Sequence, residues 1–217
     1  MPTTRYKNKE GKTLRGVTTH IGQNIGWGKD GLIYWANEQG REGLALDEAR
    51  DTATIPGTLA HAMIEAHLFT EIFDSSKFET KDKVKAETSY YEFLRWEENY
   101  KMKPISIEPH LVSELYQYGG TPDLIAQTSG GIALIDWKTG KTYSSLFLQL
   151  AAYKQLWEEN NPDQKITGGY HVLRIPRNED VPSFHHSYWE SLPCEAWESF
   201  ECSLKLSKNE KILKKLL

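Results

Sequence analysis

Two adjacent stretches, Gly119–Ala126 (GGTPDLIA) and Ile132–Gly140 (IALIDWKTG), decide the fold of this chain. A glycine-containing turn separates them, and together they predict a β-hairpin in which each strand carries a carboxylate. Because strand side chains alternate between the two faces of a sheet, Asp136 and Lys138 are expected on one face and Trp137 on the other. The hairpin therefore predicts an acidic site with a lysine beside it.

Paired carboxylates next to a lysine favour one kind of chemistry. Asp123 on the first strand and Asp136 on the second offer the oxygen ligands that hard divalent cations prefer. Hydrolysis of a phosphodiester uses a metal-activated water, and Lys138 adds a fixed positive charge. The alternative for Asp123 is a turn residue, because it follows Pro122. The pattern indicates Mg²⁺-dependent hydrolysis.

Length and composition indicate one ordinary globular domain. The chain has 217 residues, of which 39% are hydrophobic and 26% charged, and this length is sufficient to bury a sizeable core. The longest unbroken apolar run, Leu32–Ala36, is far too short to cross a bilayer, and Met1–Arg5 lack the apolar stretch of a signal peptide. We expect a cytoplasmic protein with no membrane partner, located in the host cytoplasm if it is phage-encoded.

Cysteine content and net charge exclude several classes of site. Cys194 and Cys202 are the two cysteines, so the chain cannot form a four-cysteine zinc or iron–sulfur site. The formal net charge is −4, from 26 basic and 30 acidic residues. Contact with a polyanion would therefore depend on a local basic patch rather than on the overall field.

Hydrophobic periodicity predicts the order of the elements. We expect residues 1–56 to form a basic, glycine-rich arm and helices packed on a core of residues 57–217, in a single domain. The sequence predicts helices over 31–39, 46–53, 57–73, 81–100, 144–159 and 194–217, and strands over 105–108, 111–118, 123–127, 131–137 and 168–175. This order of helix, antiparallel strands, helix and strand, with extra helices at both ends, is typical of an α/β fold.

Four motifs in this order resemble the successive signatures of RecB-like nucleases, which belong to the PD-(D/E)XK superfamily. They are Gly57–His61 (GTLAH), Gly120–Asp123 (GTPD), Asp136–Gly140 (DWKTG) and Gln149–Tyr153 (QLAAY). The resemblance spans about residues 17 to 175, and small phage-encoded exonucleases are the most similar members in size. It implies a restriction-endonuclease-like α/β core with additional N- and C-terminal helices.

The resemblance also implies an activity. Such proteins are metal-dependent DNA exonucleases that use Mg²⁺ or Mn²⁺ and act on free DNA ends in phage replication or recombination. A single-strand annealing protein is an implied partner. The chain lacks the four cysteines of the iron–sulfur branch of the family, so a cluster-free enzyme is expected.

Site residues follow from the same resemblance. Asp123 and Asp136 would hold the metal, with the backbone carbonyl of Trp137 as a further ligand, and His61 would complete the shell. Lys138 would position the attacking water and stabilise charge on the phosphate. Asp123, Asp136 and Lys138 are thus the expected catalytic residues.

Substrate contacts are implied for the helix that follows. Gln149 and Tyr153 lie on adjacent turns and would contact substrate, although Tyr153 also falls on the apolar stripe and suits a core position equally well. Lys141, together with the basic arm and the lysines of the last helix, could border a DNA groove. Weaker acidic candidates near the site are Glu65, Glu108 and Glu114.

Other functions fit the sequence less well. Gly11–Thr13 and Gly140–Thr142 imitate the end of a phosphate-binding loop, but Tyr6 and Ile135 replace the required earlier glycine, so no nucleotide cofactor is expected. A structure-specific endonuclease and a catalytically inactive DNA-binding module with the same fold stay open. A glycosidase needs no strand lysine and is disfavoured.

Overall fold

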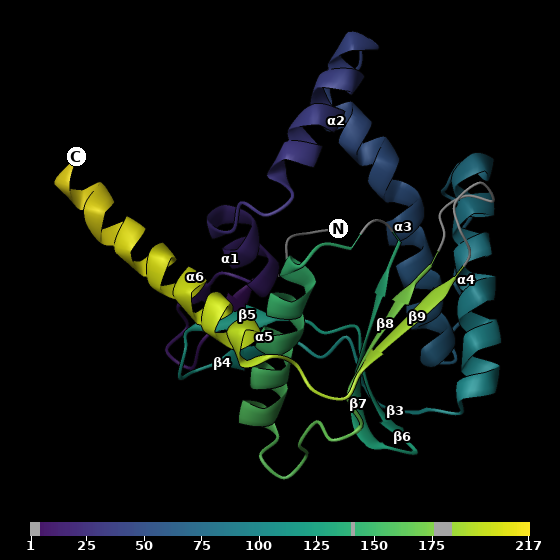
Figure 1. Cartoon of the computed structure of the whole chain (residues 1–217). Coiled ribbons are helices and arrows are strands. Elements are labelled where there is room, and N and C mark those ends of the chain that lie inside the picture. Colours follow the sequence, from purple (N-terminus) through teal and green to yellow (C-terminus); the bar gives the residue numbers. More distant parts are fainter. Residues whose placement is uncertain (1–4, 140–141, 176–183) are drawn as a thin grey trace.

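The computed structural model describes residues 5–139, 142–175 and 184–217. A five-stranded mixed sheet occupies its centre, with helices on both faces (Figure 1). In spatial order the strands are β3 (Lys103–Ile107), β6 (Leu124–Thr128), β7 (Gly131–Lys138), β8 (Tyr170–Arg174) and β9 (His185–Trp189). The β7–β8 pair is parallel and the other three pairs are antiparallel.

Helices form the two outer layers, and two small hairpins accompany them. The helices are α1 (Val17–Asn24), α2 (Lys29–Arg41), α3 (Leu46–Leu68), α4 (Thr80–Tyr100), α5 (Ser145–Asn160) and α6 (Cys194–Leu213), which ends in a 3-10 turn at Lys214–Leu216. The hairpins are β1 (Tyr6–Lys7) with β2 (Thr13–Leu14), and β4 (Leu111–Ser113) with β5 (Tyr118–Gly120).

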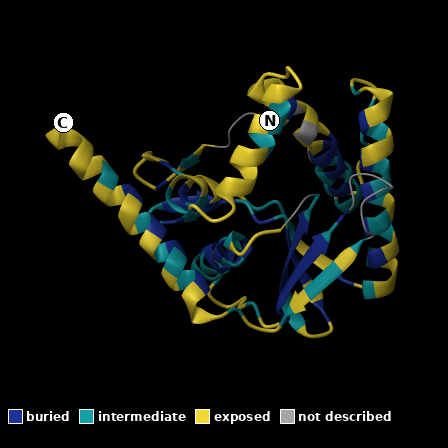
Figure 2. Ribbon diagram, turned by 45° about the horizontal axis from the view of Figure 1, so that its top comes forward, coloured by how far each residue is buried: buried dark blue, intermediate teal, exposed yellow. Residues whose placement is uncertain are grey.

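The sheet divides the core into two apolar layers. Leu134 of β7 packs in the layer formed by α5 and α6, whereas Ile135 and Trp137 pack in the layer formed by α3 and α4. Figure 2 shows the central strands β6, β7 and β8 and the inner sides of α3 and α5 as largely buried, while α2 and the end of α6 are exposed. The alternation predicted for β7 is therefore confirmed, and it places Asp136 and Lys138 on the α5 face.

This arrangement is the mixed α/β fold that the sequence predicts. The β7–α5–β8 segment is a parallel crossover, the connection expected where a helix joins two parallel strands. The helices predicted over 81–100 and 144–159 and the strands predicted over 123–127 and 131–137 are confirmed to within one residue at each end. Among the described residues, no helix has both the length and the apolar character required to cross a membrane.

The predicted break at Pro56 is wrong. Helix α3 continues through this proline, although a proline in a helix interior removes one backbone hydrogen bond and costs about 3 kcal/mol. Leu59, Ala60 and Ile64 are fully buried, so the second half of α3 is held by the core independently of the first. The expected boundary between the N-terminal segment (residues 1–56) and the core (residues 57–217) stays a prediction. It falls inside this continuous helix.

Two further elements differ from the sequence predictions. The strand predicted over 111–118 is wrong, because the chain reverses and forms the β4–β5 hairpin, with Gln117 at a positive φ of 58°. The sequence predicts no helix before residue 31, but the basic arm contains α1, in which Val17 and His20 are buried against α5 and α6. In both places long-range packing overrides weak local preferences.

We predict that replacing Gly168 destabilises the fold. A Cβ atom at Gly168 would lie 2.6 Å from the carbonyl oxygen of Gly131 and 2.8 Å from its carbonyl carbon, and neither atom can move without shifting the start of β7. Gly168→Ala is expected to lower the free energy of unfolding by about 1–3 kcal/mol in urea denaturation. The matched control is Gly22→Ala in α1, where the space is open and helix propensity predicts a gain of about 0.5–1 kcal/mol. Equal stabilities of the two variants would contradict this account.

Candidate metal centre and active site

The β6–β7 hairpin positions the two aspartates. Leu124 pairs with Ile135, and extending this antiparallel register by one residue places Asp123 opposite Asp136. The backbone N–H of Trp137 donates a hydrogen bond to Oδ2 of Asp123 at 3.0 Å, which fixes the Asp123 carboxylate at the end of β7. The register brings together two carboxylates that are 13 positions apart in the chain.

Three side chains from three elements form a compact group of possible ligands. His61 extends from α3, Glu108 follows β3 and Asp123 precedes β6, and one ligand atom from each lies within 4.8 Å of the other two. The backbone N–H of Glu108 donates to the carbonyl oxygen of Asp123 at 3.0 Å, so the β3–β6 pairing sets this proximity. Glu108 has a φ of +42°, a conformation that residues other than glycine adopt at an energetic cost and that is common at functional sites.

This donor set fits a divalent cation. Two ligand atoms that bind one ion at about 2.1–2.4 Å can be at most about 4.2–4.8 Å apart, and the three ligand atoms lie within that upper limit of one another. One imidazole and two carboxylates suit Mg²⁺ or Mn²⁺ better than the soft metals that prefer thiolates. The residues present therefore fit the cation that the sequence predicts.

The electrostatics of the group also favour a bound cation. Burial raises the pKa of Glu108 to about 7, and the charges of Glu65 and Asp123 contribute to this shift. Burial likewise raises the pKa of Asp123, while Lys138 acts in the opposite direction. The pKa of His61 is lowered to about 4 by burial and by the charge of Lys138, so its imidazole is neutral and available as a ligand at pH 7. A bound cation reduces the electrostatic repulsion between clustered carboxylates of this kind.

Asp136 and Lys138 form a separate buried pair. Asp136 is fully buried, and the ammonium nitrogen of Lys138 lies 2.9 Å from its Oδ1 and 2.7 Å from its Oδ2. Lys138 donates a hydrogen bond to Oδ1, and its ammonium group also forms a close ion pair with Oδ2. Asp136 was predicted to share the metal with His61 and Asp123, but the three-residue group contains Glu108 in its place. The metal-binding role of Asp136 stays a prediction.

Lys138 is held in its charged form. Burial alone would lower its pKa, but the carboxylates of Asp136 and Asp123 outweigh this effect and raise the pKa above the ordinary value. Burial raises the pKa of Asp136, and Lys138 offsets part of that increase. An ammonium group donates hydrogen bonds and has no lone pair, so at this position Lys138 supplies positive charge and cannot accept a proton.

Tyr153 and Gln149 lie on the α5 side of the carboxylates. Tyr153 is 5% exposed and belongs to the α5 core layer, as the core interpretation predicts. Its hydroxyl accepts a hydrogen bond from Nε2 of Gln149 at 3.0 Å. Burial, followed by the charges of Asp123 and Asp136, raises the pKa of Tyr153 well above its usual value, so the phenol stays protonated beside the acids. Contact of the pair with substrate stays a prediction.

The other candidates lie in different surroundings. Glu65 is half-buried one turn after His61 and acts on Glu108 through its charge. Glu114 accepts a hydrogen bond from the backbone N–H of Lys9 at 2.8 Å and is not in the three-residue group. Lys141 lies outside the described residues. The carbonyl of Trp137 stays a predicted ligand, and the indole of Trp137 packs edge-on against His61, with ring centres 5.9 Å apart.

The structure adds residues that local patterns do not reveal. The hydroxyl of Tyr6 lies 3.0 Å from Oγ1 of Thr121, two residues before Asp123, and Nδ1 of His110 lies 2.8 Å from the same oxygen. The Tyr6 ring covers Gly119 so closely that a side chain there would collide with it. The N-terminal arm therefore supports the loop that carries Asp123, over a separation of more than 100 residues.

Comparison with known proteins gives one family match. A family model described as the PD-(D/E)XK nuclease superfamily matches residues 34–210. The crystal structure of a candidate exonuclease from Eubacterium rectale aligns with a TM-score of 0.46 and 11% sequence identity, covering 71% of this chain and 65% of that one. The chain thus spans less than two thirds of that protein's length. No curated protein matches the chain.

We predict that divalent cations stabilise the folded protein through this group. Mn²⁺ or Mg²⁺ that binds only the folded state should add about 2–3 kcal/mol of stability at 100 times its dissociation constant, seen as a rise in the thermal midpoint. Asp123→Asn should remove most of this rise, because it removes a charged ligand. Glu114→Gln is the control and should keep the full rise. The same rise in Asp123→Asn as in the wild type would show that the cation binds elsewhere.

Proposed function

The chain belongs to the PD-(D/E)XK nuclease superfamily, and we propose that it is a metal-dependent DNA exonuclease that hydrolyses phosphodiester bonds from the ends of linear DNA. The observation that carries this proposal is the group of His61, Glu108 and Asp123 next to the buried pair of Asp136 and Lys138. All five lie within the residues that match the family. A cation site beside a fixed ammonium group is the arrangement that phosphodiester hydrolysis uses.

Mg²⁺ or Mn²⁺ is the proposed cofactor. His61, Glu108 and Asp123 would hold it, with Asp136 and the carbonyl of Trp137 as further proposed ligands. When bound, such a cation lowers the pKa of a water molecule and polarises an oxygen of the phosphate. The neutral imidazole of His61 suits this role, because a protonated ring has no free lone pair.

The chain supplies the remaining contributions through fixed charge and hydrogen bonds. Lys138 would orient the attacking water and balance the negative charge that develops on the phosphate, and Asp136 holds its ammonium group in place. The phenol of Tyr153, protonated and held by Gln149, is a second donor on the α5 side of the site. Both donors are held in position before substrate binds, because Asp136 contacts Lys138 and Gln149 contacts Tyr153.

Within this activity, we favour an exonuclease, which removes nucleotides from DNA ends, over an endonuclease, which cuts at internal positions. The four motifs that resemble RecB-like, phage-type exonucleases support it. A role in phage replication or recombination and a partnership with a single-strand annealing protein follow from that resemblance alone and stay predictions. An endonuclease of the same superfamily would cut a closed circular DNA that an exonuclease leaves intact, so this substrate distinguishes the two.

We predict that Lys138→Gln lowers the rate of nucleotide release from linear DNA in Mg²⁺ by about 10²–10³-fold, because it removes charge stabilisation at the phosphate. Release of acid-soluble nucleotides from an end-labelled duplex and from a single strand measures the rate. Lys103→Gln, at an exposed position on β3, is the control and should keep full activity. Undiminished activity in Lys138→Gln would refute the proposed role.

Folding of this variant needs its own control. Lys138→Gln leaves the buried Asp136 without a partner, which destabilises a fold by about 3–5 kcal/mol. The double variant Asp136→Asn with Lys138→Gln removes both charges and should recover most of the lost stability while staying inactive. A stable double variant with wild-type activity would show that the pair is only structural.

A further inference from the structure

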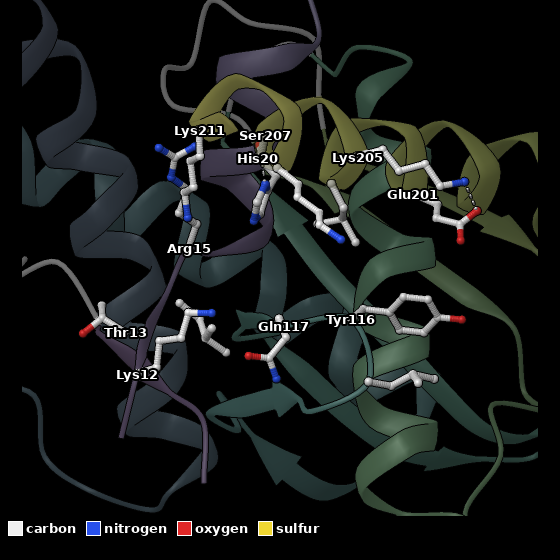
Figure 3. Close-up of a pocket in the computed structure, with 14 residues that line it drawn as sticks. Lys12, Thr13, Arg15, His20, Tyr116, Gln117, Glu201, Lys205, Ser207 and Lys211 are labelled. Carbon is white, nitrogen blue, oxygen red and sulfur yellow. Dashed lines mark hydrogen bonds and ion pairs between the residues drawn. The ribbon is translucent and has the colours of Figure 1, made fainter. Parts of the chain in front are cut away.

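A second candidate site lies between α6, α1 and the two small hairpins. It is a cavity of about 520 Å³, and none of its lining residues belongs to the candidate metal group or to the buried Asp136–Lys138 pair (Figure 3). Figure 3 shows α6 above this space, and Lys12, Gln117 and Tyr116 on its opposite side. The cavity is therefore built from residues outside the candidate active site.

Positive charge dominates the walls. Five basic side chains line the cavity, and among the described lining residues Glu201 is the single carboxylate. Glu201 pairs with Lys205 at 3.3 Å, and Glu210, which does not line the cavity, lies 3.8 Å from Arg15. Two carboxylates thus face five basic side chains, and the positive charge stays in excess. The basic residues are Lys12, Arg15, Lys205, Lys208 and Lys211. Such a lining attracts an anion, although the net charge of the whole chain is negative.

A hydrogen-bond chain identifies which nitrogen of His20 carries hydrogen. Nδ2 of Asn24 donates to the carbonyl oxygen of His20 at 2.9 Å, and this oxygen can only accept, so the assignment of the amide is secure. The same Nδ2 donates to Oγ of Ser207 at 2.7 Å. Oγ of Ser207 lies 2.9 Å from Nδ1 of His20, and its own hydrogen is available for that bond. On this basis we assign Nδ1 as the acceptor, which places the ring hydrogen of the neutral imidazole on Nε2.

Nε2 of His20 is consequently a buried donor without an acceptor. His20 is 6% exposed, and Nε2 has no hydrogen-bond partner among the described residues. Figure 3 shows the ring extending from Ser207 into the space that Arg15, Lys12 and Gln117 surround. A buried donor without a partner is unfavourable, and an acceptor bound in the cavity would remove that cost. Burial, then Arg15 and Lys211, lower the pKa of His20 to about 4, so the ring is neutral at pH 7.

We propose that this cavity binds a phosphate group of a DNA strand, with Nε2 of His20 as a hydrogen-bond donor and Lys12, Arg15 and Lys208 as charge partners. A phosphate offers several oxygens to donors that converge from different sides, as they do here. The proposal rests on the proposed function for the identity of the polymer. The inference that a phosphate group binds here depends only on the residues of the cavity.

The position of the cavity suits a strand that also reaches the metal group. The carbonyl oxygen of Arg15 accepts a hydrogen bond from the N–H of Gly119 at 3.1 Å. Gly119 precedes Asp123 by four residues, a separation of at most about 14 Å in an extended chain. Successive phosphates of one strand advance by about 3.4 Å along a duplex axis, so the backbone of Arg15 at the cavity and that of Asp123 are separated by only a few nucleotide steps.

The first test measures DNA binding without cleavage. The affinity of the full chain for fluorescently labelled single-stranded and duplex oligonucleotides is measured in EDTA over a range of salt concentrations. The double variant Lys12→Gln with Lys208→Gln changes two exposed lysines of the lining and should weaken binding by about tenfold and reduce the salt slope by about one to two. Lys85→Gln, an exposed lysine on α4, is the matched control and should leave both unchanged. Equal changes of DNA affinity in the double variant and in Lys85→Gln would overturn the proposal.

The second test observes His20 directly. In ¹⁵N NMR spectra of the histidine rings, inorganic phosphate should shift the Nε2 signal of His20 in the wild type and shift it much less in the double variant. A shift with phosphate combined with unchanged DNA affinity in the double variant would indicate a site for small anions and overturn the DNA assignment. No shift with either phosphate or DNA would overturn the site itself. Both readouts are independent of catalysis, so loss of cleavage alone would refute only the proposed function.

Discussion

The buried carboxylate of Asp136 is the constraint on which the rest of the structure depends. It lies in β7, which is paired on both sides, and it is fully buried. An isolated charge in such a position is strongly unfavourable, so it must have a partner of opposite sign. Lys138 supplies that partner from the same strand and the same face, because strand side chains repeat every two residues. One short segment thus contains both the charge and its compensation.

The surrounding layers make this segment a rigid base for the acidic site. Leu134 and Ile135 anchor β7 in opposite apolar layers, so the strand cannot shift its register without exposing one of them. The register in turn places Asp123 opposite Asp136, and the β3–β6 pairing adds Glu108. The carboxylates therefore remain close despite their mutual repulsion, and a divalent cation is the natural means of relieving it.

The N-terminal arm connects the acidic site with the basic cavity. Tyr6 contacts Thr121 at the start of the Asp123 loop, and its cross-strand partner Leu14 lines the cavity. The acidic group attracts cations, whereas the cavity attracts anions. The hydrogen bond from the N–H of Gly119 to the carbonyl oxygen of Arg15 joins the segment before Asp123 to a residue that lines the cavity.

Sequence alone determined the features that depend on local geometry. The period of two along β7 placed Asp136 and Lys138 on one face, the helical spacing of α5 placed Gln149 and Tyr153 on adjacent turns, and Gly130 and Gly131 marked the turn between β6 and β7. Only the tertiary structure decided that Glu108, treated as a weak candidate, joins His61 and Asp123, and that α3 continues through Pro56. It also placed Nε2 of His20, which has no hydrogen-bond partner among the described residues, at a basic cavity. These features depend on contacts between residues far apart in the chain, whose free energies exceed the small preferences that local sequence expresses.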